Sequence, residues 1–158
     1  MDRKPAFQQT ELLNELLHGT ADPLAWLCTI EEEEAIANAI RLRFPRGMPY
    51  KGAALFDYTP DARTWPAPLS DVVPRARPFL DLVAAEVGLL GADQLTVLWD
   101  DLDYLSISLP YSLFLTKLED LLEMPSHMFV LPTDLTWCLA FRTIGDMGLC
   151  YSVSAAAL

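Results

Sequence analysis

Three aspartates, Asp100, Asp101 and Asp103, fall within four positions directly after an apolar run. Carboxylates this close together are typical ligands of hard cations such as Mg²⁺, often alongside substrate phosphates. The run lacks the glycine and the distal glutamate of a calcium-binding loop, and no basic residue stands near it to hold a phosphate. The polar turn of a β-hairpin and an acidic knob that contacts another protein explain the same residues. We expect no metal ion and no cofactor here.

Nucleophilic catalysis needs a nucleophile, a base and an orienting group that meet in space. The two histidines are His18, at the end of a predicted helix, and His127, ahead of a predicted strand. Cys138 follows Trp137 in a predicted buried strand, where packing is its expected role. No G-x-S-x-G, phosphate-binding loop or G-x-G-x-x-G motif is present. A glycosidase-like carboxylate pair stays open among the 22 acidic residues, but we expect a protein without enzymatic activity.

The cysteines indicate a reducing compartment. There are three of them, Cys28, Cys138 and Cys150, with no C-x-x-C pair. An odd number without paired spacing argues against a disulfide framework and against a zinc site. No apolar stretch reaches the roughly 18 residues of a membrane-spanning helix, and the first residues contain no apolar signal core. We therefore expect a cytoplasmic protein.

The charge is strongly negative and unevenly distributed. Eleven Lys and Arg stand against 22 Asp and Glu, a net charge of −11. Residues 78–158 contain only Lys117 and Arg142 against 11 acidic residues, a net charge of −9. Such a field repels nucleic acid and anionic membranes, and it attracts a basic protein. A role in solubility alone explains the same charge.

Hydrophobic periodicity and turn residues predict the elements that position these side chains. Thr29 and Glu32 match a capping box that begins a helix ending near Arg43, and Pro78 is expected in the first turn of another. The predicted helices cover 6–18, 30–43, 78–90 and 110–122. The predicted strands cover 24–28, 52–58, 94–99, 104–109, 128–131, 137–143 and 149–154. This order predicts one α+β domain over 1–158: a mixed, partly antiparallel sheet of six or seven short strands with about four helices packed on it.

The tryptophans divide into two groups. Trp26, Trp99 and Trp137 lie in predicted strands and are expected in the core. Trp65 lies in the proline-rich stretch 60–78, which is expected to be mostly irregular loop. An exposed tryptophan on a loop is typical of an interface anchor, but Trp65 folded back as a lid on the core fits equally well.

The C-terminal third resembles a known family. A strand ending in proline, Met128–Pro132, follows a predicted amphipathic helix, and Asp134 and Trp137 then open the last hairpin. This order is similar to small bacterial immunity proteins, including those paired with contact-dependent growth-inhibition toxins. The resemblance implies a cytoplasmic protein that binds and blocks the C-terminal domain of one cognate toxin, a basic domain and often a nuclease.

The resemblance and the charge together define a candidate interface. The expected charged contacts are Asp100, Asp101, Asp103, Glu119, Asp120 and Glu123, with Trp65 and Tyr104 as anchors. An acidic adaptor or regulatory subunit is the alternative, and a small hydrolase or metal-dependent enzyme is the third. Neither a nucleic acid nor a membrane is an expected partner.

Overall fold

The computed structural model describes eight stretches of the chain. They are residues 25–44, 47–50, 53–57, 63–66, 72–100, 106–123, 127–142 and 145–152, with the backbone alone for 47–50 and 53–57. The predicted helix over 6–18, which ends at His18, lies outside these residues. So do three of the predicted contact residues, Asp101, Asp103 and Tyr104.

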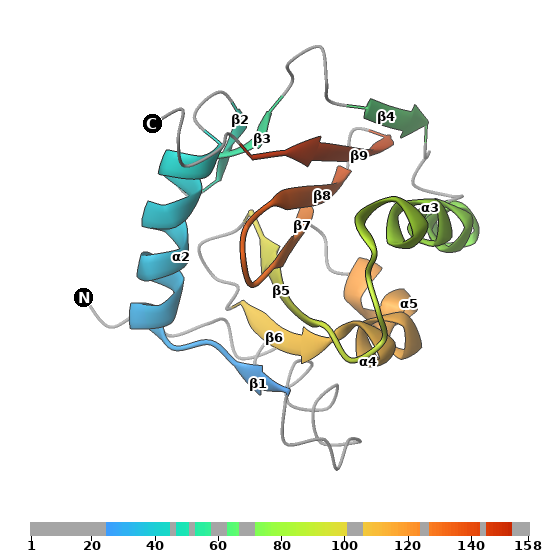
Figure 1. Cartoon of the computed structure of the whole chain (residues 1–158), viewed down its shortest axis with the longest axis horizontal. Coiled ribbons are helices and arrows are strands. Elements are labelled where there is room, and N and C mark those ends of the chain that lie inside the picture. The colour runs from blue at the N-terminus through green and yellow to red at the C-terminus, as the bar shows by residue number, and fades with distance from the viewer. Residues whose placement is uncertain are drawn as a thin grey trace.

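A seven-stranded sheet forms the centre of the described structure (Figure 1). Its order is β1-β6-β5-β7-β8-β9-β4, and every neighbouring pair is antiparallel. The bounds are Trp26–Leu27 (β1), Ile107–Pro110 (β6), Gln94–Trp99 (β5), Met128–Pro132 (β7), Trp137–Arg142 (β8), Asp146–Tyr151 (β9) and Arg63–Pro66 (β4). A separate hairpin pairs Gly47–Tyr50 (β2) with Ala53–Asp57 (β3). The prediction of an α+β fold is confirmed.

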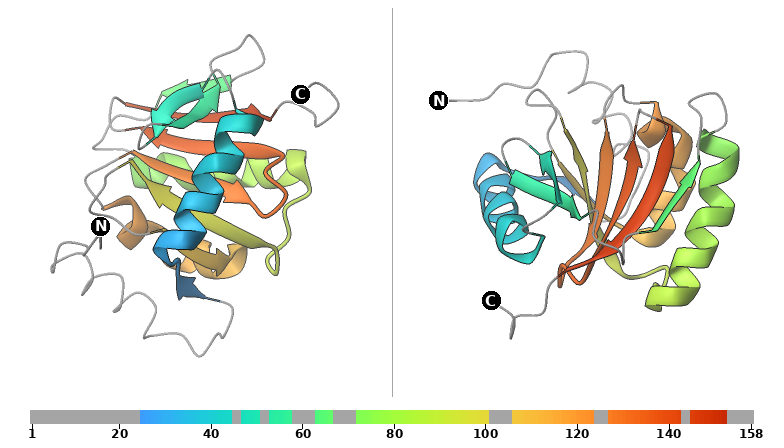
Figure 2. Two further views of the ribbon diagram at one scale, coloured as in Figure 1. Left: turned by 90° about the vertical axis from the view of Figure 1, so that its left-hand side faces the viewer. Right: turned by 90° about the horizontal axis from the view of Figure 1, so that it is seen from above.

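Helices cover both faces of the sheet, so the described residues form three layers (Figure 2). Helix α2 (Ile30–Arg43) and the β2–β3 hairpin lie on one face. Helices α3 (Val72–Val87), α4 (Tyr111–Thr116) and α5 (Leu118–Leu122) lie on the other. None of the described helices is long and apolar enough to cross a bilayer.

Two buried clusters follow from the alternation of side chains along each strand. Along β5, Leu95, Val97 and Trp99 join the larger cluster beneath α3, α4 and α5. Leu98 points the other way and packs with Ile40 of α2 in the smaller cluster. The sheet therefore buries apolar side chains on both faces, which explains why its central strands are nearly continuous in hydrophobicity.

Helix α2 begins where the capping box predicts. Thr29 Oγ accepts a hydrogen bond of 3.1 Å from the Glu32 backbone N–H, and Glu32 Oε1 accepts one of 3.1 Å from the Thr29 N–H. The reciprocal bonds satisfy two N–H groups at the helix start that have no partner within the helix. Arg41 and Arg43 lie in the last turn, as expected from the helix dipole.

The proline-rich stretch is more regular than predicted. Part of it is strand β4, which pairs with β9, and α3 begins at Val72 instead of Pro78. Pro78 therefore lies inside the helix. An interior proline removes one helical hydrogen bond, but burial of Ala76, Phe79 and Leu80 on the sheet holds this part of the helix in place.

Helix α3 also ends earlier than predicted, at Val87, because Gly88 takes the left-handed conformation with a φ of 70°. The Leu89 N–H then donates to the Ala84 carbonyl at 2.9 Å. This bond is typical of a glycine-terminated helix. Leu90, predicted on the apolar face, lies outside the helix and is 68% exposed.

The helix predicted from Pro110 is divided in two. Lys117, with φ −103° and ψ 12°, separates α4 from α5. The break turns Leu121 into the core and leaves Leu122 only partly buried. The last hairpin forms as predicted, although β9 begins at Asp146, three residues earlier than expected.

Candidate protein-binding surface

Four of the six predicted acidic contacts, Asp100, Glu119, Asp120 and Glu123, lie within the described residues. Asp100 follows the last residue of β5, and its N–H donates to the His127 carbonyl at 3.0 Å. The exposed side chains of Glu119, Asp120 and Glu123 belong to α5 or directly follow it. The end of β5 pairs with the start of β7, and β7 is the next strand after α5 in the chain. Among the described residues, then, the predicted acids come from neighbouring elements.

Trp65 is not part of that group. It lies on β4, the fourth strand from β5, about 19 Å away at the usual strand spacing of about 4.8 Å. Its ring lies 4.9 Å from the ring of Phe79 on α3, and it packs against the larger core cluster. Trp65 is therefore a lid on the core, the second of the two expected roles.

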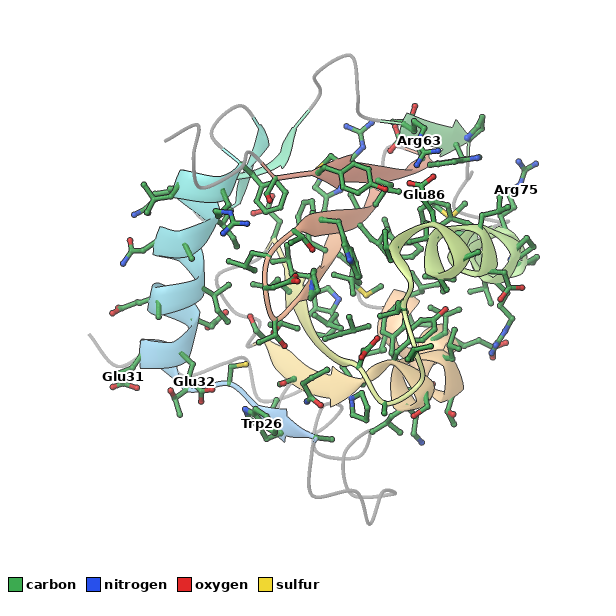
Figure 3. All side chains as sticks on the ribbon, in the orientation of Figure 1. Trp26, Glu31, Glu32, Arg63, Arg75 and Glu86 are labelled. Carbon is green, nitrogen blue, oxygen red and sulfur yellow. The ribbon has the colours of Figure 1, made fainter. Side chains whose placement is uncertain are left out.

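Trp26 was predicted in the core, and this prediction is wrong. Its side chain is 40% exposed, because β1 is the outermost strand of the sheet. The indole Nε1 donates a hydrogen bond of 3.4 Å to Glu32 Oε2 at the start of α2. Figure 3 shows Trp26 beside Glu32, with Glu31 farther away on the other side of Glu32. The other two tryptophans expected in the core, Trp99 and Trp137, are buried as predicted.

A groove of about 370 Å³ opens between α2 and the sheet next to Trp26. Small side chains create this space: Ala35 and Ala39 on α2 face Thr96 and Ser108 on the strands. The full lining comprises Trp26, Cys28, Glu32, Ala35, Ile36, Ala39, Gln94, Thr96, Ser108, Pro132, Thr133 and Leu135. The groove is therefore mostly apolar, with an aromatic ring and a carboxylate at its rim.

The rim is negatively charged. Glu31, Glu32 and Glu34 are exposed in the first turns of α2. The backbone hydrogen bond from Thr29 is the main reason that the pKa of Glu32 lies below its ordinary value, so this carboxylate keeps its charge at neutral pH. Among the described residues that line the groove there is no lysine or arginine. The rim thus offers acceptors and negative charge to a basic partner.

The neighbouring glutamate has a different role. Glu33 is buried, and its Oε1 accepts a hydrogen bond of 2.9 Å from Ser106 Oγ. This bond connects the start of α2 to the residue before β6. The glutamate run therefore contains a capping residue that also lines the groove (Glu32), a buried residue bonded to Ser106 (Glu33) and two exposed charges in the first turns of α2 (Glu31 and Glu34).

All three cysteines are buried. Burial raises the pKa of the Cys28 thiol to about 12, with Glu32 and Glu33 adding to the effect. Cys138 and Cys150 face each other on β8 and β9, and burial raises the pKa of Cys138 well above its ordinary value. A thiol attacks as the thiolate, so Cys28 and Cys138 are unreactive at neutral pH. Within the described stretches no cluster of three or more His, Cys, Asp or Glu could hold a metal ion.

The opposite edge of the sheet is strand β4, which carries an arginine. Arg63 on β4 forms an ion pair with Glu86 on α3, and its guanidinium lies 5.7 Å from the centre of the Trp65 ring. The Tyr151 hydroxyl donates to the same Glu86 carboxylate. Arg63 and Arg75 lie far from Trp26 and Glu32 in Figure 3. The charge of Arg63 at this edge is therefore balanced by Glu86, whereas the groove beside Trp26 is lined by no lysine or arginine among the described residues.

The prediction from sequence thus missed Trp26 and the adjoining carboxylates. One signal was present, the run of four glutamates shortly after a tryptophan, but a capping box explained it fully. Comparison with known proteins found no matching family model and no matching curated protein. What the chain binds is therefore inferred from the surface that its own residues build.

Proposed function

We propose that the protein is a non-enzymatic binding protein that neutralises a cognate bacterial toxin domain by covering a basic surface of that domain. The observation that carries the proposal is the exposed Trp26 beside Glu32 at the rim of an apolar groove. Tryptophan is prominent among the residues that dominate binding energy at interfaces. A carboxylate next to it adds a charged hydrogen bond to Lys or Arg of a partner.

The total charge supports a basic partner. With a net charge of −11, the protein attracts a positively charged domain over several ångströms of solution and raises its association rate. A nuclease displays such charge, because it binds phosphates through Lys and Arg. A protein that occupies this basic surface blocks the substrate without any catalytic group of its own.

The decisive experiment is co-expression of the protein with the C-terminal domain of the large protein that the neighbouring gene encodes. The expected result is an equimolar complex and rescue of the cells from the toxicity of that domain. Each partner should also raise the melting temperature of the other, because both bind only in the folded state. If the neighbouring domain is not toxic and forms no complex, an acidic adaptor is the better description.

Matched variants locate the interface. The double variant Trp26→Ala/Glu32→Lys should weaken the complex by at least about 2 kcal/mol, since it removes an exposed aromatic anchor and reverses a charge. Glu119→Lys/Asp120→Lys changes the total charge by more, but it acts on α5 on the other side of the sheet. If the α5 variant abolishes rescue and the Trp26 variant does not, the interface is the one predicted from the sequence.

A further inference from the structure

A second cavity, of about 280 Å³, adjoins the groove. Gln94, Pro132 and Thr133 line both cavities. They meet because Leu95 at the start of β5 pairs with Pro132 at the end of β7. The first residue of β5, the last residue of β7 and Thr133 therefore form a low ridge, with the groove on one side and the second cavity, which we call the notch, on the other.

The notch is lined by two carboxylates from different turns, those of Asp93 and Asp134. Asp93 Oδ2 accepts a hydrogen bond of 2.7 Å from the Leu90 N–H. Asp134 Oδ1 accepts bonds of 3.2 Å and 2.8 Å from the N–H and Oγ of Thr136. A carboxylate has about four acceptor positions, so these bonds fix the orientation of both groups and leave capacity for a further donor.

The end of α3 adds to the negative potential of the notch. Val87 and Gly88 line it, and the carbonyl end of a helix carries a partial negative charge of about half an electron. No lysine or arginine is among the described residues that line either cavity. The notch is therefore suited to a positively charged group, and the groove beside it to an apolar one.

We propose that the groove and the notch form one continuous docking surface for an extended basic segment of the partner. An apolar side chain of that segment packs against Trp26 in the groove, and a Lys or Arg side chain near it enters the notch between Asp93 and Asp134. This inference rests on the proposed function, since it names the part of the toxin domain that the protein holds. Charge complementarity selects the occupant, because the exposed ionic groups among the described residues that line the two cavities are all carboxylates.

A peptide titration followed by ¹H–¹⁵N NMR tests the surface without the toxin. The probe is the amidated tripeptide N-acetyl-Leu-Ala-Lys, and the matched control carries Glu in place of Lys. We expect weak binding of the Lys peptide, on the order of 1 mM, with shifts at the Trp26 indole, the Gln94 side-chain amide and the Thr136 backbone amide. The Glu peptide should leave these signals unchanged. Equal shifts with both peptides, or none with either, would overturn the proposal.

Variants that remove the charge of the two notch carboxylates but keep their shape test whether the charge binds the peptide. Asp93→Asn and Asp134→Asn keep an oxygen that accepts the same backbone and hydroxyl bonds, so the turns are retained. Together they should weaken binding of the Lys peptide by about threefold, and the remaining affinity should depend less on salt. If the double variant binds the Lys peptide as tightly as the native protein, no cation enters the notch.

The same variants distinguish this inference from the proposed function. If the toxin complex forms and Asp93→Asn/Asp134→Asn leaves its association rate unchanged, the docking surface is wrong and the toxin-neutralising function stands. If the Lys peptide binds at the notch but no toxin complex forms, the surface stands and the function is wrong. Shifts of the same signals on raising the concentration of the protein alone would mean that a second copy occupies the surface, which also overturns the proposal.

Discussion

Ser106 Oγ donates a hydrogen bond of 2.9 Å to Oε1 of Glu33, joining the first turn of α2 to the strand layer. Both residues are buried, with 0% and 6% of their surface exposed. A carboxylate is expensive to remove from water unless it is hydrogen-bonded. Helix α2 forms one wall of the groove and the sheet forms its floor. The bond therefore fixes the distance between the helix and the sheet.

Loss of the Ser106 hydroxyl should destabilise the protein. Ser106→Ala removes a donor to a buried carboxylate, and we expect the free energy of unfolding to fall by about 1–3 kcal/mol. Urea denaturation followed by circular dichroism measures the change. Glu34→Ala is the matched control on the exposed side of the same turn and should change stability by less than about 0.5 kcal/mol. Equal effects of the two variants would show that the buried bond contributes little.

Substitution of Trp26 should weaken binding of the toxin domain, whereas substitution of Trp65 should lower the stability of the fold. Trp26→Ala removes an exposed side chain and should leave the melting temperature nearly unchanged while weakening the toxin complex. Trp65→Ala removes a ring that packs against Phe79, and it should lower the free energy of unfolding by about 2–3 kcal/mol. Thermal denaturation and calorimetric titration on the same two variants test both statements. The assignment of Trp65 to the core is wrong if its loss weakens binding and not folding.

Alkaline pH should destabilise the protein through Cys28. Burial raises the pKa of its thiol in the folded state from 9.0 to about 12, so the unfolded chain loses the proton first. The stability that depends on the protonated thiol is complete below pH 9 and is lost as pH rises toward about 12. The pKa values of Tyr111 and Cys138 are raised mainly by burial too, with the same sign. Melting temperatures between about pH 8 and pH 11 measure the loss.

Removal of the thiol provides the control for this pH dependence. Cys28→Ala should reduce the slope of melting temperature against pH above pH 9, with little effect on it below. An unchanged slope would assign the alkaline loss to Tyr111 and Cys138. Slow alkylation of the native protein by iodoacetamide near neutral pH, and fast alkylation in urea, should accompany the result, because only the thiolate reacts.

The end of α3 depends on Gly88. Its φ of 70° lies in the left-handed region, and a Cβ there would meet no atom within 4 Å. Gly88→Ala should therefore cost about 1 kcal/mol from backbone strain alone. Gly91→Ala is the matched control: its Cβ would lie 3.5 Å from the Ser112 Cβ, an ordinary contact, and stability should stay within about 0.5 kcal/mol. Equal costs at the two sites would contradict the conformational explanation.

Much of the fold could be predicted because its signals are local. Strand β5 has the predicted bounds, and the capping box marks the start of α2. The boundaries of α3 were missed, because a proline and a glycine were given their most frequent roles. Pro78 lies in the helix interior, where tertiary packing outweighs the lost hydrogen bond, and Gly88 ends the helix before Gly91.

The candidate site was harder to predict, because it depends on how distant elements meet. Trp26 is exposed only because its strand is the outermost one, and sequence periodicity does not encode strand order. Asp93 and Asp134 come from two turns that adjoin through the pairing of Leu95 with Pro132. The acids that follow one another in sequence, such as Asp100 and its neighbours, were easier to find than those that share a cavity.

The two outermost strands of the sheet, β1 and β4, come early in the chain, and the five strands between them all come later. During synthesis, residues 63–66 leave the ribosome long before their pairing partners at 146–149 exist. Strand β4 therefore has no pairing partner until translation is nearly complete. A premature stop shortly before β9 would leave β4 without its pairing partner, although α3, against which Trp65 packs, would already be complete.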